Sequence, residues 1–160
     1  MIRIDEAKIF SEIKKKRPRA VVLNAPEGLL FKVQDTALKI EKRFKIPAII
    51  VGDPCYGVCD LVDGDVKRLN ADLAFHIGHN VAVSKMGNFT ISIDAFDDIS
   101  FNQVLAQTLP VLKRYEKVGL CTISQHLHQI QRSKRYLERK GVKAVIGRGR
   151  GLLKDGQIFG

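Results

Sequence analysis

Two cysteines lie four positions apart in the segment GDPCYGVCD, at positions 55 and 59 of a chain of 160 residues. Closely spaced thiolates can bind zinc, form a redox pair or ligate an iron–sulfur cluster. The Cys-x3-Cys spacing departs from the Cys-x2-Cys of redox dithiols, and a structural zinc site usually needs two close pairs. Zinc held together with histidines, plain core packing and a cluster ligand all stay open. The glycine turn before Asp60 favours Cys59 over Cys55 as a ligand.

The third cysteine and the histidines have different surroundings. Cys121 lies inside the apolar stretch GLCTIS and is expected in the core. His76 lies within an apolar run and is expected as a hydrogen-bonded core residue, whereas His79, at the end of that run, is better placed for a binding site. Gln125, His126 and His128 open a predicted helix, where they either contact an anion or serve as caps and surface groups.

A glycine-rich stretch, GRGRG, lies near the end of the sequence. Its spacing is not that of a dinucleotide fingerprint. Glycines nevertheless allow a ligand to approach the backbone closely, and arginines can bind a carboxylate. The candidate ligand-contacting residues of this stretch are Gly147, Gly149 and Gly151, with Arg148 and Arg150 between them.

These residues share a position, because each group follows a predicted strand. Ligands of an open α/β sheet gather outside the carboxyl ends of its strands. The strands are expected at 19–25, 47–53, 72–79, 89–95, 117–124 and 143–149, and several are near-continuous apolar runs typical of parallel strands. Amphipathic patterns predict helices over about 4–16, 27–44 and 124–141, the last with Ser124 as its N-cap and Gly141 just beyond it.

This alternation predicts an α/β fold with an open, mainly parallel sheet flanked by helices. We expect a first α/β domain over 1–98 that carries the cysteine loop. Residues 99–160 are expected to be part of a second, similar domain: a helix and bridge over 99–116, then a β-α-β unit and a hairpin turning at Lys154–Gly156.

The net charge of the chain is +10, and much of it lies in two basic runs, 14–19 and 131–140. Such a surface attracts nucleic acid, an acidic protein or a small anion, or it is a solvated helix face. The charge is not interleaved with aromatic residues, which makes nucleic acid a weak candidate. We expect a cytoplasmic protein without a signal peptide or membrane span, because apolar runs are short and three cysteines lack a secretory context.

Four segments resemble, in order, the archaeal diphthamide synthase family: NAPEGLL, GDPCYGVCDLVDGDVKRLNADLAFHIGH, GLCTISQHLHQ and VIGRGRGLLKDGQIFG. The resemblance implies a homodimeric enzyme of three similar α/β domains, each giving one cysteine to a 4Fe–4S cluster. Such enzymes cleave S-adenosylmethionine in a non-standard direction and transfer its 3-amino-3-carboxypropyl group to a histidine of translation elongation factor two. Cys59, in the family motif Tyr-Gly-x-Cys-Asp, is then the cluster ligand, with Cys55 and Cys121 not ligands.

One departure from the family pattern matters. The family's second cysteine follows the segment that here is 157–160, where the given sequence stops. A single thiolate cannot hold a 4Fe–4S cluster tightly, because protein-bound clusters normally have three or four cysteine ligands. We therefore expect a fragment, a chain completed by a homologous partner, or a degenerate relative. Residues expected near S-adenosylmethionine are His79, Gln125, His126, Gly147, Gly149 and Gly151. The alternatives are a non-catalytic α/β binding or regulatory subunit and, less favoured, a basic nucleic-acid-binding domain.

Overall fold

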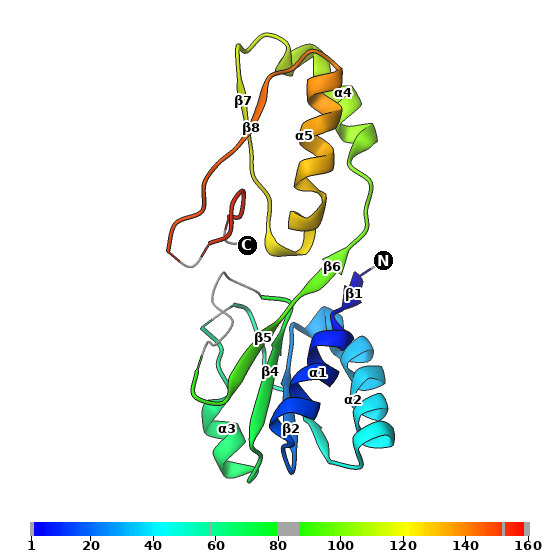
Figure 1. Ribbon diagram of the computed structural model, residues 1–160, viewed down its shortest axis with the longest axis vertical. Coiled ribbons are helices and arrows are strands. Elements are labelled where there is room, and N and C mark those ends of the chain that lie inside the picture. The colour runs from blue at the N-terminus through cyan, green and yellow to red at the C-terminus, as the bar shows by residue number, and fades with distance from the viewer. Residues whose placement is uncertain (1, 58, 80–86, 152, 159–160) are drawn as a thin grey trace. The chain divides into compact units, whose positions relative to one another are not determined.

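The computed structural model describes residues 2–57, 59–79, 87–151 and 153–158 (Figure 1). The chain divides into two compact units. The first unit comprises Arg3–Ala95, and the second comprises Phe96–Gly160 with Met1–Ile2. A separate two-stranded sheet consists of β1 (Ile2–Ile4) and β6 (Ala95–Asp97). None of the helices in the described part of the chain is long and apolar enough to cross a lipid bilayer.

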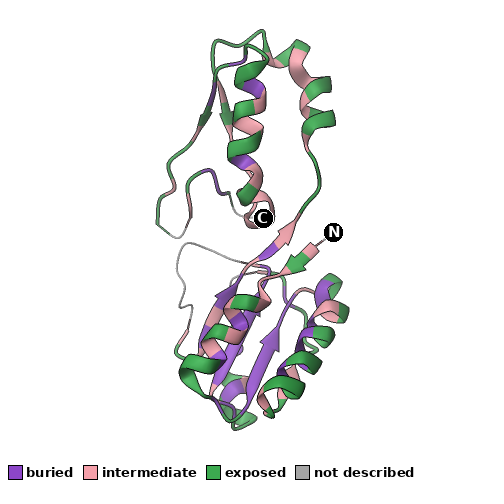
Figure 2. Ribbon diagram, turned by 45° about the vertical axis from the view of Figure 1, so that its right-hand side comes forward, coloured by how far each residue is buried: buried purple, intermediate pink, exposed green. Residues whose placement is uncertain are grey.

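The first unit is built on a four-stranded parallel sheet. Its strands lie in the order β3 (Ala48–Ile50), β2 (Val21–Asn24), β4 (Leu73–Ile77) and β5 (Thr90–Ile93). Every residue of β2 and β4 is buried (Figure 2). The continuous apolar runs in the sequence thus arise because helices cover both faces of these strands.

The two faces of this sheet are covered by different helices (Figure 1). On one face, Val66 of α3 (Asp63–Arg68) packs with Val22 and Ala74. The opposite face is covered by α1 (Glu6–Lys16) and α2 (Leu30–Phe44), which follows the 3-10 turn η1 (Glu27–Leu29). The helices bury Ile9 and Ile13 of α1, and Val33, Thr36, Ala37 and Ile40 of α2.

The second unit contains a parallel pair of strands, β7 (Val118–Leu120) and β8 (Ala144–Ile146). Between them run the 3-10 helix η2 (Ser124–Gln129) and α5 (Ile130–Arg139), and α4 (Asn102–Leu112) precedes β7. Its core contains Leu137, Val142 and Ala144, with Leu105 and Leu109 packed against them. The α/β fold class with a parallel, helix-flanked sheet is therefore confirmed.

One local prediction in the second unit is wrong, and a second, the hairpin, lies partly outside the described residues. Ser124 does not cap an α-helix through its side chain, because 124–129 form a 3-10 helix and the α-helix begins at Ile130. The turn at 154–156 exists, since the Gln157 N–H donates to the Lys154 carbonyl at 3.0 Å. It does not lead into a hairpin among the described residues: Gln157 pairs in parallel with Thr122, just past the end of β7.

Candidate functional site

The cysteine loop, residues 51–62, connects β3 to α3 and is organised by one carboxylate. Asp60 Oδ2 accepts the backbone N–H of Tyr56 at 2.6 Å and that of Gly57 at 2.8 Å. These two donors hold the pKa of Asp60 below its ordinary value, because they favour the charged carboxylate. The Asp60 N–H donates back to the Gly57 carbonyl at 3.2 Å. The loop is therefore a closed turn that holds the backbone on both sides of its second cysteine.

The two cysteines of this loop face different surroundings. Cys59 is exposed, whereas Cys55 is buried, with 5% of its surface accessible. Burial raises the pKa of the Cys55 thiol, and the charge of Asp60 adds to the effect. Its Sγ lies 3.7 Å from Nδ1 of His79, close enough for a thiol–imidazole hydrogen bond. At neutral pH Cys55 is therefore a protonated, inward-facing thiol, and Cys59 is the accessible one.

Asn24, at the end of β2, ties the loop to the sheet. Its side chain Nδ2 donates to the Asp60 carbonyl at 2.6 Å and lies 3.2 Å from Nδ1 of His76. Asn24 is directly opposite His76 in the parallel register of β2 and β4. The Asn24 carboxamide thus links the cysteine loop to the carboxyl ends of β2 and β4.

The two histidines of β4 and its end are neutral at pH 7. His76 is completely buried, and desolvation, with a smaller effect of His79, lowers its pKa from 6.5 to about 4. Desolvation likewise lowers the pKa of His79, with the charge of Asp60 acting in the opposite direction. His76 Nε2 is buried and has no hydrogen-bond partner among the described residues. The prediction that His76 is a hydrogen-bonded core residue is confirmed for Nδ1 only.

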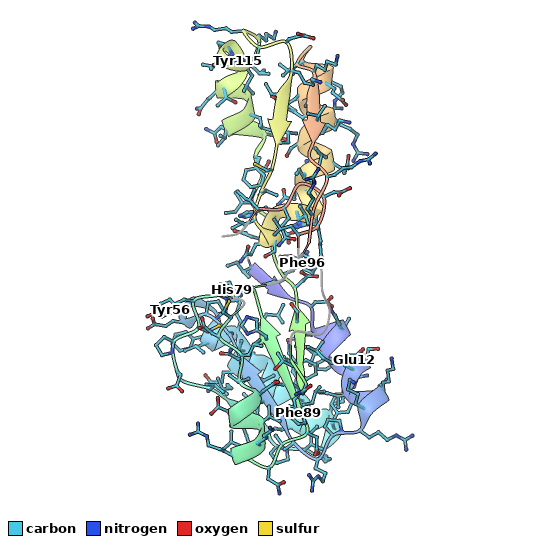
Figure 3. The ribbon with its side chains drawn as sticks, turned by 90° about the vertical axis from the view of Figure 1, so that its left-hand side faces the viewer. Glu12, Tyr56, His79, Phe89, Phe96 and Tyr115 are labelled. Carbon is cyan, nitrogen blue, oxygen red and sulfur yellow. The ribbon has the colours of Figure 1, made fainter. Side chains whose placement is uncertain are left out.

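Figure 3 shows where this site lies in the first unit. Tyr56, which is 84% exposed, and His79 lie at the same end of the unit, whereas Phe89, just before β5, lies at the other end. The end with Tyr56 and His79 is the carboxyl edge of the sheet. The structure therefore brings together, at the edge where the sequence predicted a site, residues from three segments: Asn24, Cys55, Asp60, His76 and His79.

The remaining predicted site residues belong to the second unit. His126 packs its ring edge-on against Phe101, 5.1 Å between centroids, and its buried Nδ1 has no partner among the described residues. It lines a mostly apolar cavity of about 150 Å³ together with Cys121 and Gln129. Cys121 is exposed, so the prediction that it lies in the core is wrong. The strand ends at Leu120, one residue before it.

The glycine-rich stretch packs against the turn that follows it. A Cβ at Gly149 would overlap the backbone of Leu153 and Lys154, and the Gly149 N–H donates to Asp155 Oδ1 at 2.8 Å. Gly147 accepts the Gly156 N–H at 2.8 Å through its carbonyl. Gly151 has a φ of +62°, which glycine adopts without strain. Within the described residues, at least Gly149 is thus required by the local fold itself.

Sequence reasoning assigned no role to Asn24 or Asp60. A signal for Asp60 exists, because an aspartate closing a glycine-containing turn often accepts backbone N–H groups of that turn. For Asn24 the sequence signal is its position at the end of the strand predicted over 19–25; its partners could not be predicted, since they are remote in sequence and depend on strand order. His128, which the sequence placed beside His126, is exposed and lies 3.2 Å from Asp98 Oδ1 through Nε2.

Comparison with known proteins relates the chain to one group. The profile of a family described as putative diphthamide synthesis protein matches residues 25–160. The 2-(3-amino-3-carboxypropyl)histidine synthase of Pyrococcus horikoshii is 30% identical over 159 residues, covering 98% of this chain and 46% of that protein. The synthase of the same name from Methanocaldococcus jannaschii is 38% identical over 87 residues, 49% of this chain and 25% of that protein.

A solved structure is also similar. The crystal structure of Dph2 from Pyrococcus horikoshii with a 4Fe-4S cluster matches with a TM-score of 0.89 and 29% sequence identity. The match covers 99% of this chain and 48% of that one. The chain therefore spans about half the length of the two Pyrococcus horikoshii chains that it matches.

Proposed function

The chain belongs to the diphthamide synthesis protein family, and from this premise we propose that it takes part in the first step of diphthamide formation. In that step the 3-amino-3-carboxypropyl group of S-adenosylmethionine is transferred to a histidine of translation elongation factor two. The chain acts there either within a longer enzyme or in an assembly, a homodimer or a pair with a homologous chain, that supplies the other cluster cysteines. Its place of action is the cytoplasm, where elongation factors work.

Cys59 is the residue through which this chain contributes to a 4Fe–4S cluster. Its thiol is exposed at the carboxyl edge of the sheet, on a turn that Asp60 holds closed by two backbone hydrogen bonds. These features fit a cluster ligand, which needs an accessible thiolate on a fixed backbone. They account for one ligand, and the remaining ligands come from other residues. When bound, the cluster supplies the electron that cleaves S-adenosylmethionine.

The other candidate residues hold the cysteine loop in position or bind S-adenosylmethionine. Asn24 holds the loop against β2 and β4, and the neutral ring of His79 lies beside the loop where it contacts substrate without adding charge. In the second unit, Gln125, His126, Gly147, Gly149 and Gly151 contact S-adenosylmethionine, with the exposed Arg148 and Arg150 available for its carboxylate. Asn24, Cys59 and His79 belong to the proposed domain 1–98, and the second set, from Gln125 to Gly151, belongs to the proposed domain 99–160. The basic helix faces bind the protein substrate.

The exposure of Cys59 on a closed loop carries this proposal, and its removal tests it. We would reconstitute the wild-type chain, Cys59→Ala and Cys121→Ala with iron and sulfide under anaerobic conditions. Each is reconstituted alone and together with a family member that contains the second and third cluster cysteines. Bound iron, acid-labile sulfide and visible absorbance are measured. Cys121→Ala is the matched control, because Cys121 is also exposed but lies in the other unit.

In the assemblies with the family member, we expect cluster content to fall with Cys59→Ala and to stay at the wild-type level with Cys121→Ala, whereas the chain alone should hold little cluster. Equal cluster content in the assemblies of both variants would remove Cys59 as a ligand. Transfer of labelled 3-amino-3-carboxypropyl to elongation factor two is measured in the same assemblies. A normal cluster without any transfer would instead favour the non-catalytic binding or regulatory subunit.

A further inference from the structure

A second group of metal-binding side chains lies on the inner side of the cysteine loop. Cys55, His76 and His79 each offer one ligand atom, a sulfur or a ring nitrogen, within 4.8 Å of the other two. We propose that these three residues form a binding site for a zinc-type divalent cation, distinct from the exposed Cys59. The ligands do not include Cys59, the cysteine assigned to the cluster, and His79 is the one residue that this site shares with the substrate contacts proposed above.

The spacing of the ligands fits a tetrahedral zinc site. Zinc binds a thiolate sulfur at about 2.3 Å and an imidazole nitrogen at about 2.0–2.1 Å, which places the two ligands about 3.6 Å apart. The observed distance between Cys55 Sγ and His79 Nδ1 is 3.7 Å. This pair alone would also be explained as a thiol–imidazole hydrogen bond. The third residue decides between the two explanations.

His76 supplies an independent observation that points to a ligand. It is completely buried in the centre of the sheet, yet its Nε2 has no partner in the described part of the chain. Its Nδ1 lies 3.2 Å from a single group, the Asn24 carboxamide. Buried side-chain nitrogens in proteins are nearly always paired with protein, water or an ion. A fully buried imidazole with so few partners, beside a thiol and a second imidazole, has the composition of a metal site.

The electrostatics of the loop favour a cation at this place. The carboxylate of Asp60 is close enough to act on both histidines, and it supplies a negative charge next to the three ligands. Both imidazoles are neutral at pH 7, as metal ligands must be, and the Cys55 thiol would release its proton on binding. Three protein ligands leave a fourth position for water.

The bound ion would join two segments of the first unit. Cys55 lies in the loop after β3, whereas His76 and His79 lie in β4 and just beyond its end. A metal bridge between them would hold the loop that carries Cys59 against the sheet. Binding is therefore expected to stabilise the loop backbone even when no iron or sulfide is supplied.

Cobalt(II) tests the site, because it replaces zinc in thiolate–imidazole sites and gives a thiolate-to-metal charge-transfer absorption. The full chain, freed of metal by a chelator, is titrated with cobalt and then with zinc as competitor. The variants are Cys55→Ser and His79→Gln, with Cys59→Ala and Cys121→Ala as controls for the two exposed thiols. Far-ultraviolet circular dichroism checks that each variant is folded, and the thermal midpoint is measured with and without zinc.

We expect the absorption in the wild type and in both controls, its loss in Cys55→Ser and at least about tenfold weaker binding in His79→Gln. Zinc should raise the thermal midpoint of the wild type and, at the same concentration, raise that of His79→Gln by less. His79 is only half-buried, so this variant remains informative if Cys55→Ser fails to fold. An absent absorption in the folded wild type, or one that survives Cys55→Ser and disappears in Cys59→Ala or Cys121→Ala, would overturn the proposal.

Discussion

Replacing Asn24 by alanine should open the cysteine loop. The Asn24 carboxamide donates to the Asp60 carbonyl at 2.6 Å and is the one described partner of His76 Nδ1 at 3.2 Å. Losing the bond to Asp60 costs about 1 kcal/mol, since that carbonyl is only part-buried and can bind water instead. Leaving the buried His76 Nδ1 unpaired costs a further 1–3 kcal/mol, approximately. The expected loss of stability of the first unit is therefore about 2–4 kcal/mol.

Cys55 provides a local measurement of this loss. Because its side chain is buried, a thiol reagent reaches it only when the loop opens, whereas Cys59 and Cys121 are exposed throughout. A loss of about 2 kcal/mol raises the open population about thirtyfold. We expect Cys55 in Asn24→Ala to be alkylated about thirtyfold faster or more, with the rates of the other two cysteines unchanged. Peptide mass spectrometry assigns the three rates.

Two further variants make the test specific. Asn24→Asp keeps the size of the side chain but places a carboxylate oxygen against the Asp60 carbonyl, so it should be at least as damaging. Gln34→Ala, at an exposed position of α2, should change the free energy of unfolding by less than about 0.5 kcal/mol. The assigned role of Asn24 is refuted if Asn24→Ala unfolds in urea with a loss below about 1 kcal/mol and Cys55 reacts at the wild-type rate.

Three other outcomes are expected. In the presence of a chelator, His76, whose pKa is lowered from 6.5 to about 4, contributes stability that is complete above pH 6.5 and is lost as the pH falls towards 4. Urea unfolding across this range should show a loss of about 3 kcal/mol from this group, and His76→Gln should remove that part and leave the smaller loss from His79. Leu137→Ala should destabilise the second unit by about 2–5 kcal/mol in thermal unfolding, against less than about 0.5 kcal/mol for the exposed Tyr115→Ala; equal effects would contradict the described core. Gly156 and Gly141 both have a left-handed backbone, but only at position 156 would a new Cβ overlap Ile130 and Ile146. Gly156→Ala should therefore be less stable than Gly141→Ala in urea unfolding by at least about 1 kcal/mol, and a smaller difference would count against this packing.

The central strands were predictable because their burial is recorded in the residues themselves. A strand covered on both faces must be apolar at successive positions, as β2 and β4 are. The same logic failed for Cys121. Its neighbours are apolar, but β7 belongs to a two-stranded sheet and ends before it, so apolar neighbours did not imply a covering layer. The parallel pairing of Gln157 with Thr122 was not predictable either, because it depends on the packing of Gly156 against α5 and β8.

The candidate site was predictable in location and not in its contacts. Reactive residues after parallel strands had to gather at one edge, and the residues of the first unit do so. The pairing of Asn24 with His76 depends on β2 and β4 being neighbours, although β3 lies between them in sequence. The contact between Cys55 and His79 depends on the path of a loop. Neither contact produces a recognisable pattern in the amino-acid sequence.

The unequal exposure of the three cysteines has a practical consequence. Cys55 is buried, while each compact unit carries one accessible thiol, Cys59 in the first and Cys121 in the second. The native chain can thus be spin-labelled at two defined points without introducing or removing any residue. Dipolar spectroscopy on such a sample would measure the separation of the two units, and its change when S-adenosylmethionine or a partner chain is added.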